Sequence, residues 1–222
     1  AIDSYYRGRA LGSIGDLSAF SFHETKNINS GEGGLLAVNN ETFVKRSEII
    51  WEKGTNRSEF FRGEVNKYGW VDIGSSFLPS ELNAAYLYAQ LENLKPIQKR
   101  RIDIWNLYYN ELRESEEKGF IRLPSIPDYA TNNAHMFYIL CRTKNERDGL
   151  ITFLKSRDIK AVFHYLSLHK SDYYAKYHDQ RELPYSDYYM DCLVRLPMYY
   201  DLRDEDVHLI SNAIRNYYKS IN

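Results

Sequence analysis

The stretch that decides the fold is residues 18–38, which read SAFSFHETKNINSGEGGLLAV. Two short apolar runs, residues 17–22 and 35–38, flank a polar connection, and their length and composition are typical of β-strands. Glycines near the end of the connection mark turns. The pattern therefore predicts two strands joined by a polar loop, and one lysine, Lys26, lies on that loop.

Lys26 has an ordinary and a chemical interpretation. Most lysines are solvated surface cations. The chemical interpretation is a lysine that forms a Schiff base with an aldehyde, which requires a site that desolvates the amine in part and lowers its pKa. Such a lysine also has to lie beside hydroxyls and backbone N–H groups that bind a phosphate, and Ser21, five residues earlier, is a candidate. Spacing alone leaves both interpretations open.

Composition excludes several classes of partner. The 222 residues carry a net charge of −1 with interspersed signs, which argues against nucleic-acid binding. Two cysteines, Cys141 and Cys192, fit a reducing compartment and no disulfide framework. No apolar run approaches the roughly 18 residues that span a bilayer, and no signal peptide is visible. We therefore expect a cytoplasmic protein with no membrane partner.

Hydrophobic spacing predicts the remaining elements. Strands are expected over residues 136–141 and 160–165, and an exposed loop over 55–69. Helices are expected over 41–53, 82–89, 102–112, 146–156 and 204–219, and a short helix or turn over 185–192. Pro96 interrupts the helical pattern, because proline cannot continue a helix interior. We place a domain boundary there, which divides the chain into domains 1–95 and 96–222.

Several motifs resemble one family. The segments SFHETKN (21–27) and GEGG (31–34) resemble the signature of the DegT/DnrJ/EryC1/StrS sugar aminotransferases. The likeness extends over nearly the whole chain, through EKGTNRS (52–58), DIGSS (72–76), LPSIPD (123–128), NAHMFY (133–138) and AVFHY (161–165). It implies an α/β fold of the PLP-dependent transferase fold type I (aspartate-aminotransferase-like). Residues 1–95 would be the C-terminal part of the large PLP-binding domain, with the end of its sheet, and 96–222 the small C-terminal α/β domain.

The resemblance implies pyridoxal 5'-phosphate (PLP) as cofactor, bound covalently to Lys26. The motifs are most similar to the subfamily that transaminates a nucleotide-linked 4-keto-6-deoxy sugar, dTDP-4-dehydro-6-deoxyglucose, with glutamate as amino donor. The product would be a 4-amino-4,6-dideoxy sugar nucleotide for surface polysaccharide such as enterobacterial common antigen. A 3-keto or UDP-sugar aminotransferase is the alternative within the family.

The resemblance also implies further cofactor contacts and a homodimer with an active site shared across its interface. Ser21 would lie at the cofactor, and Asn56, Arg57 and Ser76 are candidates for reaching the phosphate in the neighbouring subunit. Many relatives carry Asn-x-Arg before the following helix, whereas this chain has Ser76-Phe77-Leu78 there. Which residue takes the role is therefore open.

Histidines supply the substrate-side candidates. His164, Tyr165 and His169 match the family's small-domain segment that touches substrate, and His23 would support the lysine loop. We expect no metal site, because the sequence contains neither His-Glu-x-x-His nor Cys-x-x-Cys.

A rival interpretation belongs to another class. Family members carry, before the point that matches residue 1, an aspartate that pairs with the cofactor's pyridine nitrogen and a phosphate-binding loop. The likeness is thus to the C-terminal portion of a family member, and the chain alone would be a non-catalytic truncated fragment.

Overall fold

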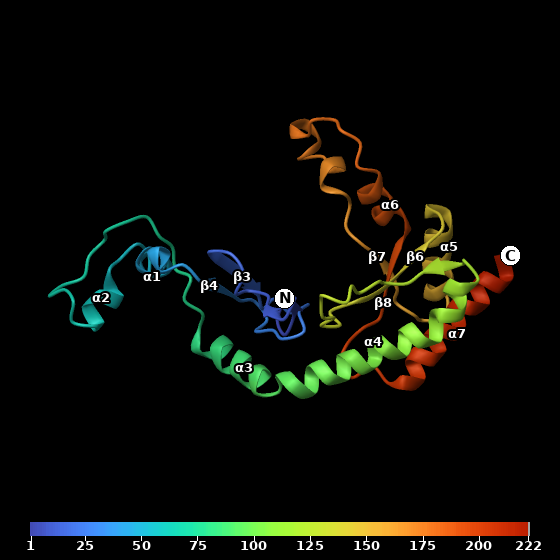
Figure 1. The fold of residues 1–222 in the computed structure, drawn as a ribbon, viewed down its shortest axis with the longest axis horizontal. Coiled ribbons are helices and arrows are strands. Elements are labelled where there is room, and N and C mark those ends of the chain that lie inside the picture. Colours follow the sequence, from blue (N-terminus) through green and yellow to red (C-terminus); the bar gives the residue numbers. More distant parts are fainter. Residues whose placement is uncertain (222) are drawn as a thin grey trace. The chain divides into compact units, whose positions relative to one another are not determined.

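The computed structural model describes residues 1–221, which form two compact units. Unit 1 contains residues 1–98 and 127–133, and unit 2 contains residues 99–126 together with those from 134 onward. Figure 1 labels most of the helices and strands of both. The chain therefore passes between the units three times, after Gln98, after Ile126 and after Asn133.

Unit 1 opens with two antiparallel hairpins. β1 (Tyr5–Tyr6) pairs with β2 (Arg9–Ala10), and β3 (Leu17–Ser21) pairs with β4 (Gly34–Val38). In the second hairpin Leu17 lies opposite Val38 and Ser21 lies opposite Gly34. The two strands predicted around the polar connection are confirmed, and residues 22–33 join them.

Three helices follow in unit 1. The single helix expected over 41–53 is a 3-10 turn, η1 (Glu41–Phe43), followed by α1 (Val44–Trp51), and Asn40 caps the turn by accepting the N–H of Thr42. α2 (Arg57–Phe61) lies within the segment expected to be an exposed loop, so that expectation was wrong there. Its Glu59 is buried and pairs with Lys45 of α1, a contact between separated segments that periodicity does not reveal.

α3 (Glu81–Glu92) is capped by Ser80, whose hydroxyl accepts the N–H of Asn83. α4 (Leu94–Glu117) begins two residues after α3 ends and places Pro96 in its first turn, where a missing N–H costs nothing. This 24-residue helix continues from unit 1 into unit 2. Pro96 thus marks the start of α4, as expected from the interrupted pattern.

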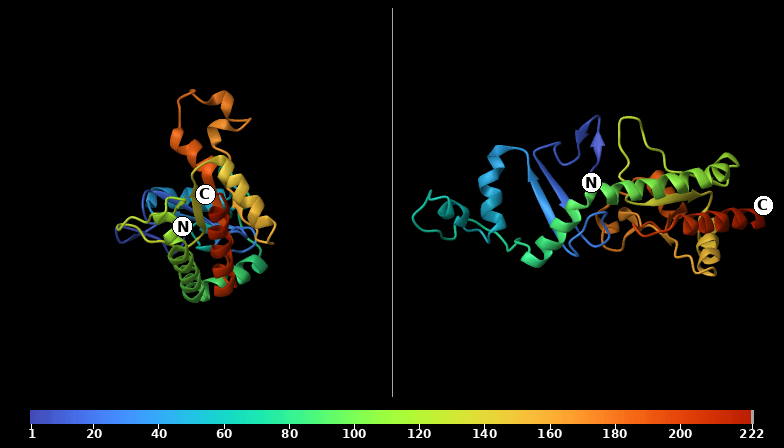
Figure 2. Two further views of the ribbon diagram at one scale, coloured as in Figure 1. Left: turned by 90° about the vertical axis from the view of Figure 1, so that its right-hand side faces the viewer. Right: turned by 90° about the horizontal axis from the view of Figure 1, so that it is seen from below.

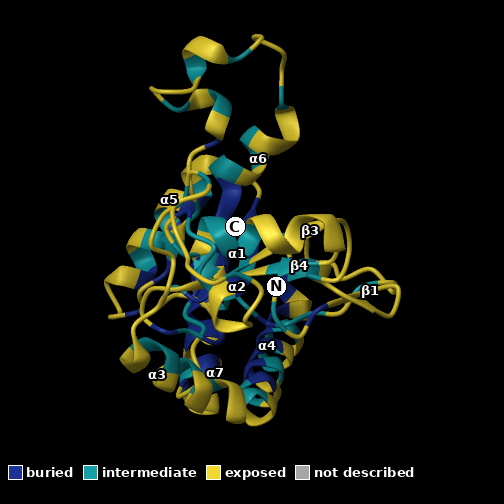
Figure 3. Cartoon of the chain, turned by 90° about the vertical axis from the view of Figure 1, so that its left-hand side faces the viewer, coloured by how far each residue is buried: buried dark blue, intermediate teal, exposed yellow. Residues whose placement is uncertain are grey.

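Few apolar side chains of unit 1 are buried. Among its described residues, only Phe22 and Ile28 are buried hydrophobic residues. The connection between α2 and α3 is almost wholly exposed (Figure 3), and Trp70, Ile73 and Leu82 each keep more than four fifths of their surface accessible. Unit 1 therefore presents a large apolar surface.

Unit 2 is built on a four-stranded antiparallel sheet. Its strand order is β5 (Ile121–Arg122), β6 (Phe137–Cys141), β8 (Leu193–Leu196), β7 (Val162–Phe163). β6 confirms the strand predicted over 136–141, and β7 is shorter than the strand predicted over 160–165. β8 was not predicted, although it lies inside the sheet between β6 and β7.

Besides most of α4, unit 2 contains the helices α5 (Lys144–Lys155), α6 (Pro184–Cys192) and α7 (Asp204–Ile221), close to the predicted ranges. Two 3-10 turns, η2 (Leu168–Lys170) and η3 (Ala175–Tyr177), lie in the long segment between β7 and α6. α7 runs alongside α4 (Figure 2), and Arg215 of α7 bonds Glu111 of α4 at 3.0 Å. The two long helices thus cover the sheet together.

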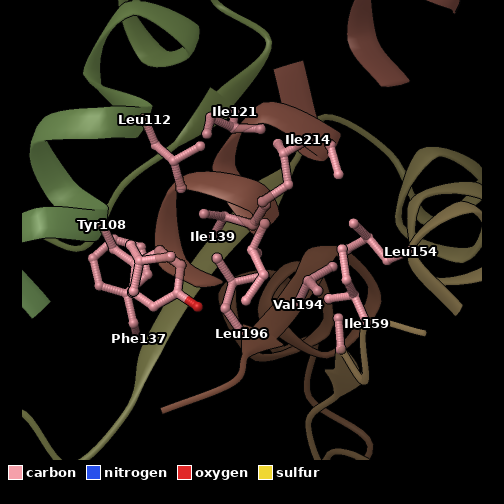
Figure 4. Packing of buried hydrophobic residues seen from close by; sticks show 14 of the residues in the cluster. Tyr108, Leu112, Ile121, Phe137, Ile139, Leu154, Ile159, Val194, Leu196 and Ile214 are labelled. Atoms are coloured by element: carbon pink, nitrogen blue, oxygen red, sulfur yellow. The ribbon is translucent and has the colours of Figure 1, made fainter. Parts of the chain in front are cut away.

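The core of the described chain lies in unit 2, between the sheet and its helices (Figure 4). Tyr108 of α4 and Phe137 of β6 stack with ring centroids 5.0 Å apart, and both are fully buried. The apolar side of α7, with Val207, Ile210 and Ile214, is buried, as are both cysteines, which are free thiols. Burial raises the pKa of Cys141 to about 12, which disfavours the thiolate form.

Candidate functional site

The loop that carries Lys26 is closed at its base by backbone hydrogen bonds. Phe22 donates its N–H to Gly33 at 2.8 Å, and Ser30 donates its N–H to Phe22 at 2.8 Å. Inside this closed loop, the N–H of Lys26 donates to the carbonyl of His23 at 2.9 Å, which forms a tight turn. The backbone around the lysine is therefore held in one conformation.

Burial differs sharply along this loop. Phe22 and Ile28 are 5% and 1% exposed and anchor it on either side of the turn, whereas Lys26 is exposed. Among the described residues, the Lys26 amine has no hydrogen bond or ion pair. A loop closed by hydrogen bonds therefore presents an amine that an aldehyde can reach. The partial desolvation expected of a Schiff-base lysine is not seen at this exposed side chain within residues 1–221.

His23 organises the polar side chains beside the turn. Its Nδ1 accepts the N–H of Thr25 at 3.2 Å and lies 3.0 Å from the Thr25 hydroxyl, while its Nε2 lies 3.4 Å from Glu32. Because Nδ1 accepts, the proton of a neutral His23 ring is on Nε2 and faces Glu32. His23 thus contacts both arms of the loop, and the supporting role expected of it stays a prediction.

Ser21 is the last residue of β3 and lies on the same hairpin as Lys26. Its Oγ accepts the N–H of His23 at 3.4 Å, and its own hydroxyl hydrogen has no acceptor among the described residues. The pair fits a phosphorylated aldehyde in part, because Lys26 offers the amine and Ser21 offers a hydroxyl donor.

Asn56 and Ser76 make local contacts in unit 1. Asn56 accepts the N–H of Gly69 at 2.9 Å and donates to Glu59 at 3.3 Å. Ser76 forms an isolated bridge with Glu52. Neither residue bonds Ser21 or Lys26 within the described chain, so the cofactor roles expected of Asn56 and Ser76 stay predictions.

The substrate-side candidates belong to unit 2. His164 follows β7, and its Nδ1 is buried without a hydrogen-bond partner among residues 1–221. Burial and the positive charge of Arg195 lower the pKa of His164. The Tyr165 ring lies 4.8 Å from the His164 ring and is 77% exposed, so these neighbours form one pair of aromatic groups.

His169 lies in η2 within a separate polar cluster. Its Nε2 is 3.0 Å from Asp187 of α6, the Lys170 ammonium is 2.9 Å from the same carboxylate, and the ring of His178 lies 5.2 Å away. The Lys170 ammonium holds the pKa of Asp187 below its usual range. His169 therefore anchors the segment between β7 and α6, and its substrate role stays a prediction.

The sequence analysis missed a hydrogen-bonded set that joins the lysine loop, through Asn27, to two residues outside it. Asn27, Gln98 and Asn133 are joined by hydrogen bonds of 2.7–3.3 Å although they are far apart in the chain. The available signal was a polar residue, Asn27, between the exposed Lys26 and the apolar Ile28.

Within residues 1–221, no group of three or more His, Cys, Asp or Glu side chains is placed to hold a metal ion. In the same part of the chain, no helix is both long and apolar enough to cross a bilayer.

Comparison with known proteins gives these residues a context. The sequence pattern of the DegT/DnrJ/EryC1/StrS aminotransferase family matches residues 1–215. The chain belongs to this family. The family resemblance inferred from the lysine loop is confirmed.

Relatives within the DegT/DnrJ/EryC1/StrS family include two named proteins. The spore coat polysaccharide biosynthesis protein SpsC of Bacillus subtilis is 29% identical over 99% of this chain and 58% of its own length. GDP-perosamine synthase of Vibrio cholerae is 28% identical over the whole of this chain and 58% of its own length. This family member thus spans a little over half the length of these curated relatives.

A solved structure of the same fold is that of the "putative sugar aminotransferase Spr1654" of Streptococcus pneumoniae, known in PLP and PMP forms. The PMP form matches with a TM-score of 0.88 at 22% identity, over 100% of this chain and 58% of the other. The expected fold class, α/β of the PLP-dependent fold type I, is confirmed.

Proposed function

We propose that the complete protein is a PLP-dependent aminotransferase of nucleotide-linked keto sugars, with Lys26 as the residue that binds the cofactor. The observation that carries the proposal is the exposed Lys26 amine on a loop closed by backbone hydrogen bonds. Membership of an aminotransferase family supports it. The PLP and PMP forms of a protein with the same fold support pyridoxal phosphate as the cofactor.

Each residue of the lysine loop has a task in this proposal. When bound, PLP supplies an electron sink that stabilises negative charge on the carbon next to the reacting nitrogen. Lys26 binds the aldehyde through Nζ and, once released, moves a proton at that same atom. The Ser21 hydroxyl would donate to the phosphate, and the contact of His23 with Glu32 would hold the turn to the other arm of the loop.

For the substrate, we propose the 4-keto group of a 4-keto-6-deoxy sugar linked to dTDP, with glutamate as amino donor. The motifs around Lys26 and around residues 52–58 support this choice. A relative named for spore coat polysaccharide biosynthesis supports a role in surface polysaccharide. His164, Tyr165 and His169 would contact the substrate from the small domain.

We also propose how the complete protein is organised. Residues 1–95 complete a large cofactor-binding domain, and residues 96–222 form the small domain. The protein is a cytoplasmic homodimer in which Asn56 or Ser76 reaches the partner's cofactor phosphate. The exposed apolar residues between α2 and α3, Trp70 and Ile73 among them, support coverage of this surface by another subunit.

Replacement of Lys26 tests the function. Reduction of the complete enzyme with borohydride should leave the cofactor mass on the peptide that contains Lys26. Lys26→Ala should lose this adduct and at least about 100-fold in turnover, because it removes both the covalent attachment and the proton carrier. Lys219→Ala, which alters an exposed lysine of α7, is the matched control and should behave as wild type. A Lys26→Ala enzyme with wild-type turnover would refute the proposal.

A substrate panel tests the finer proposal. The complete enzyme is assayed with glutamate and with 4-keto and 3-keto sugars linked to dTDP, UDP or GDP. We expect the highest kcat/KM for the dTDP-linked 4-keto-6-deoxy sugar. Preference for a 3-keto sugar, or for a UDP or GDP sugar, would assign the chain to another branch of the family.

The alternative, a non-catalytic fragment of such an enzyme, is favoured by the apolar surface that unit 1 leaves exposed. It predicts that the 222-residue chain purified alone forms no adduct at Lys26. Borohydride reduction of that 222-residue chain tests the alternative: an adduct at Lys26 would contradict it.

A further inference from the structure

Asn27 follows the exposed lysine directly and is itself buried. Only 7% of its surface is accessible. Its side-chain nitrogen donates two hydrogen bonds, one to Oε1 of Gln98 at 2.8 Å and one to the backbone carbonyl of Asn133 at 2.7 Å. Both acceptors belong to unit 1, and they lie 71 and 106 positions away in the chain. One side chain thus ties the lysine loop to two distant segments.

Both acceptors are held in place by other contacts. Gln98 lies in the first turns of α4, is 2% exposed, and donates its own amide to the Asn133 carbonyl at 3.3 Å. The side chain of Asn133 donates to the carbonyl of Ile2 at 3.2 Å. Asn27 is therefore bonded to a fixed frame and not to mobile surface groups.

The segment that contains Asn133 is also pinned to the first hairpin. Arg7 donates its N–H to Tyr129 at 2.6 Å, and Thr131 donates its N–H to Tyr5 at 3.0 Å. The frame that Asn27 engages thus includes β1, the segment 127–133 and the start of α4.

The other polar side chains near the turn make only local bonds. Among the described residues, His23 bonds Thr25 and Glu32, and Asn29 bonds the N–H of Gly31. These contacts shape the loop without fixing it to the rest of unit 1. Asn27 is the polar side chain of residues 23–29 whose hydrogen bonds leave the loop.

We propose that Asn27 is a positioning residue: its two hydrogen bonds to Gln98 and Asn133 hold the preceding amine of Lys26 at the place where it binds the cofactor and moves the proton. The inference rests on the proposed function of Lys26. Proton transfer depends steeply on the position of the amine, and a displacement of about 1 Å can cost about 100-fold in rate. The hydrogen bonds of Asn27 fix the backbone next to Lys26 and so limit the displacement of the amine.

Three single variants of the complete enzyme test this proposal. Asn27→Ala removes both hydrogen bonds, and Gln98→Leu removes one acceptor without changing the loop sequence. Asn29→Ala is the matched control, because within residues 1–221 the side chain of this loop asparagine only accepts the N–H of the neighbouring Gly31. The double variant Asn27→Ala/Gln98→Leu measures whether the two residues act as one unit.

We expect kcat to fall roughly 10- to 100-fold in Asn27→Ala and less in Gln98→Leu, with KM for the amino donor changed less than about threefold. The pH midpoint of the lysine-bound cofactor's absorbance should shift in both, and the double variant should be no worse than Asn27→Ala alone. In the cofactor-free protein, amide exchange of residues 24–28 should accelerate in Asn27→Ala and stay at the wild-type rate in Asn29→Ala.

A merely structural role predicts something different. Asn27→Ala would then lower thermal stability but leave the absorbance midpoint and kcat of the folded enzyme as in Asn29→Ala, and this result overturns the proposal. If Asn27→Ala does not fold, Gln98→Leu decides, and a wild-type absorbance midpoint and kcat there overturn it too. If the wild-type enzyme forms no adduct at Lys26, the proposed function fails. The exchange experiment then still reports whether Asn27 fixes the loop.

Discussion

Lys26 and Asn27 are neighbours with opposite surroundings. The amine is exposed, and the amide is 7% exposed and bonded to two distant segments. A lysine on a polar loop between strands was recognisable in the sequence, since its neighbours in the chain carry the family motif. The partners of Asn27 lie 71 and 106 positions away, and no local pattern indicates such a pairing.

His164 gives a prediction at the same scale. Burial and Arg195 lower its pKa, so the unfolded chain binds the proton of this imidazole more tightly than the folded chain. Its contribution to stability is complete above the ordinary histidine pKa of about 6.5 and is lost as pH falls from there through the lowered folded pKa. We predict that His164→Asn reduces the loss of thermal stability between about pH 7.5 and about pH 5.

The control for this measurement is His208→Asn, which removes an exposed histidine paired with Glu111 at 3.1 Å. The His208→Asn protein should keep the part of the stability loss at low pH that we assign to His164. An unchanged pH dependence in His164→Asn would show that His164 is not responsible.

At the scale of elements, two glycines bring backbone segments together. Gly54 lies three residues after the end of α1 and has a φ of +78°. Its carbonyl accepts the N–H groups of Val71 and Asp72 at 2.9 Å and 3.1 Å. A Cβ on Gly54 would overlap the carbonyl oxygen of Asp72, and one on Gly74 would overlap the backbone of Gly54. The segment after Trp70 therefore lies against the end of α1 only because both positions lack a side chain.

We predict that Gly54→Ala destabilises the protein by roughly 3 kcal/mol or more, from left-handed strain plus the forced shift of a packed backbone. Gly63→Ala is the control, since Gly63 has φ of +76° with nothing within 4 Å of an added Cβ, and it should cost about 1 kcal/mol. Denaturant unfolding measures both. Equal costs would mean that the close approach of the two segments is unimportant.

β8 illustrates how an element escapes a sequence pattern. β8 (Leu193–Leu196) reads LVRL and follows α6 directly. No glycine or proline between them marks in the sequence where the helix ends. The segment becomes a strand because β6 and β7 bind its two edges, and three of its four residues are buried. Short apolar runs are ambiguous between helix and strand until their partners are known.

For the whole molecule, burial is uneven between the units. The buried cluster that includes Tyr108, Phe137 and Ile214 belongs to unit 2, whereas unit 1 exposes Trp70 and Ile73 at 84% and 87%. Exposed apolar patches of this kind mark interaction surfaces. This asymmetry supports the proposed homodimer, in which a second subunit covers unit 1.

Tryptophan fluorescence tests that coverage. Trp70 is 84% exposed, Trp51 43% and Trp105 7%. We predict that in the dilute, dissociated protein Trp70→Phe removes most of the emission that acrylamide quenches, because Trp70 is the most accessible indole. In the dimer the same substitution should change quenching little. Trp105→Phe, which removes the buried indole, is the control, and equal accessibility of Trp70 in both states would contradict the proposed interface.

The sequence alone determined the hairpin around Lys26, the predicted helices of unit 2 and the family, because these depend on residues that are close together in the chain. Only the tertiary structure decided that β8 joins the sheet, that segment 127–133 returns to unit 1 and that Asn27 bonds Gln98 and Asn133. These features depend on contacts between distant segments. The free energy of such contacts comes from burial and hydrogen bonds that exist only once the chain is folded.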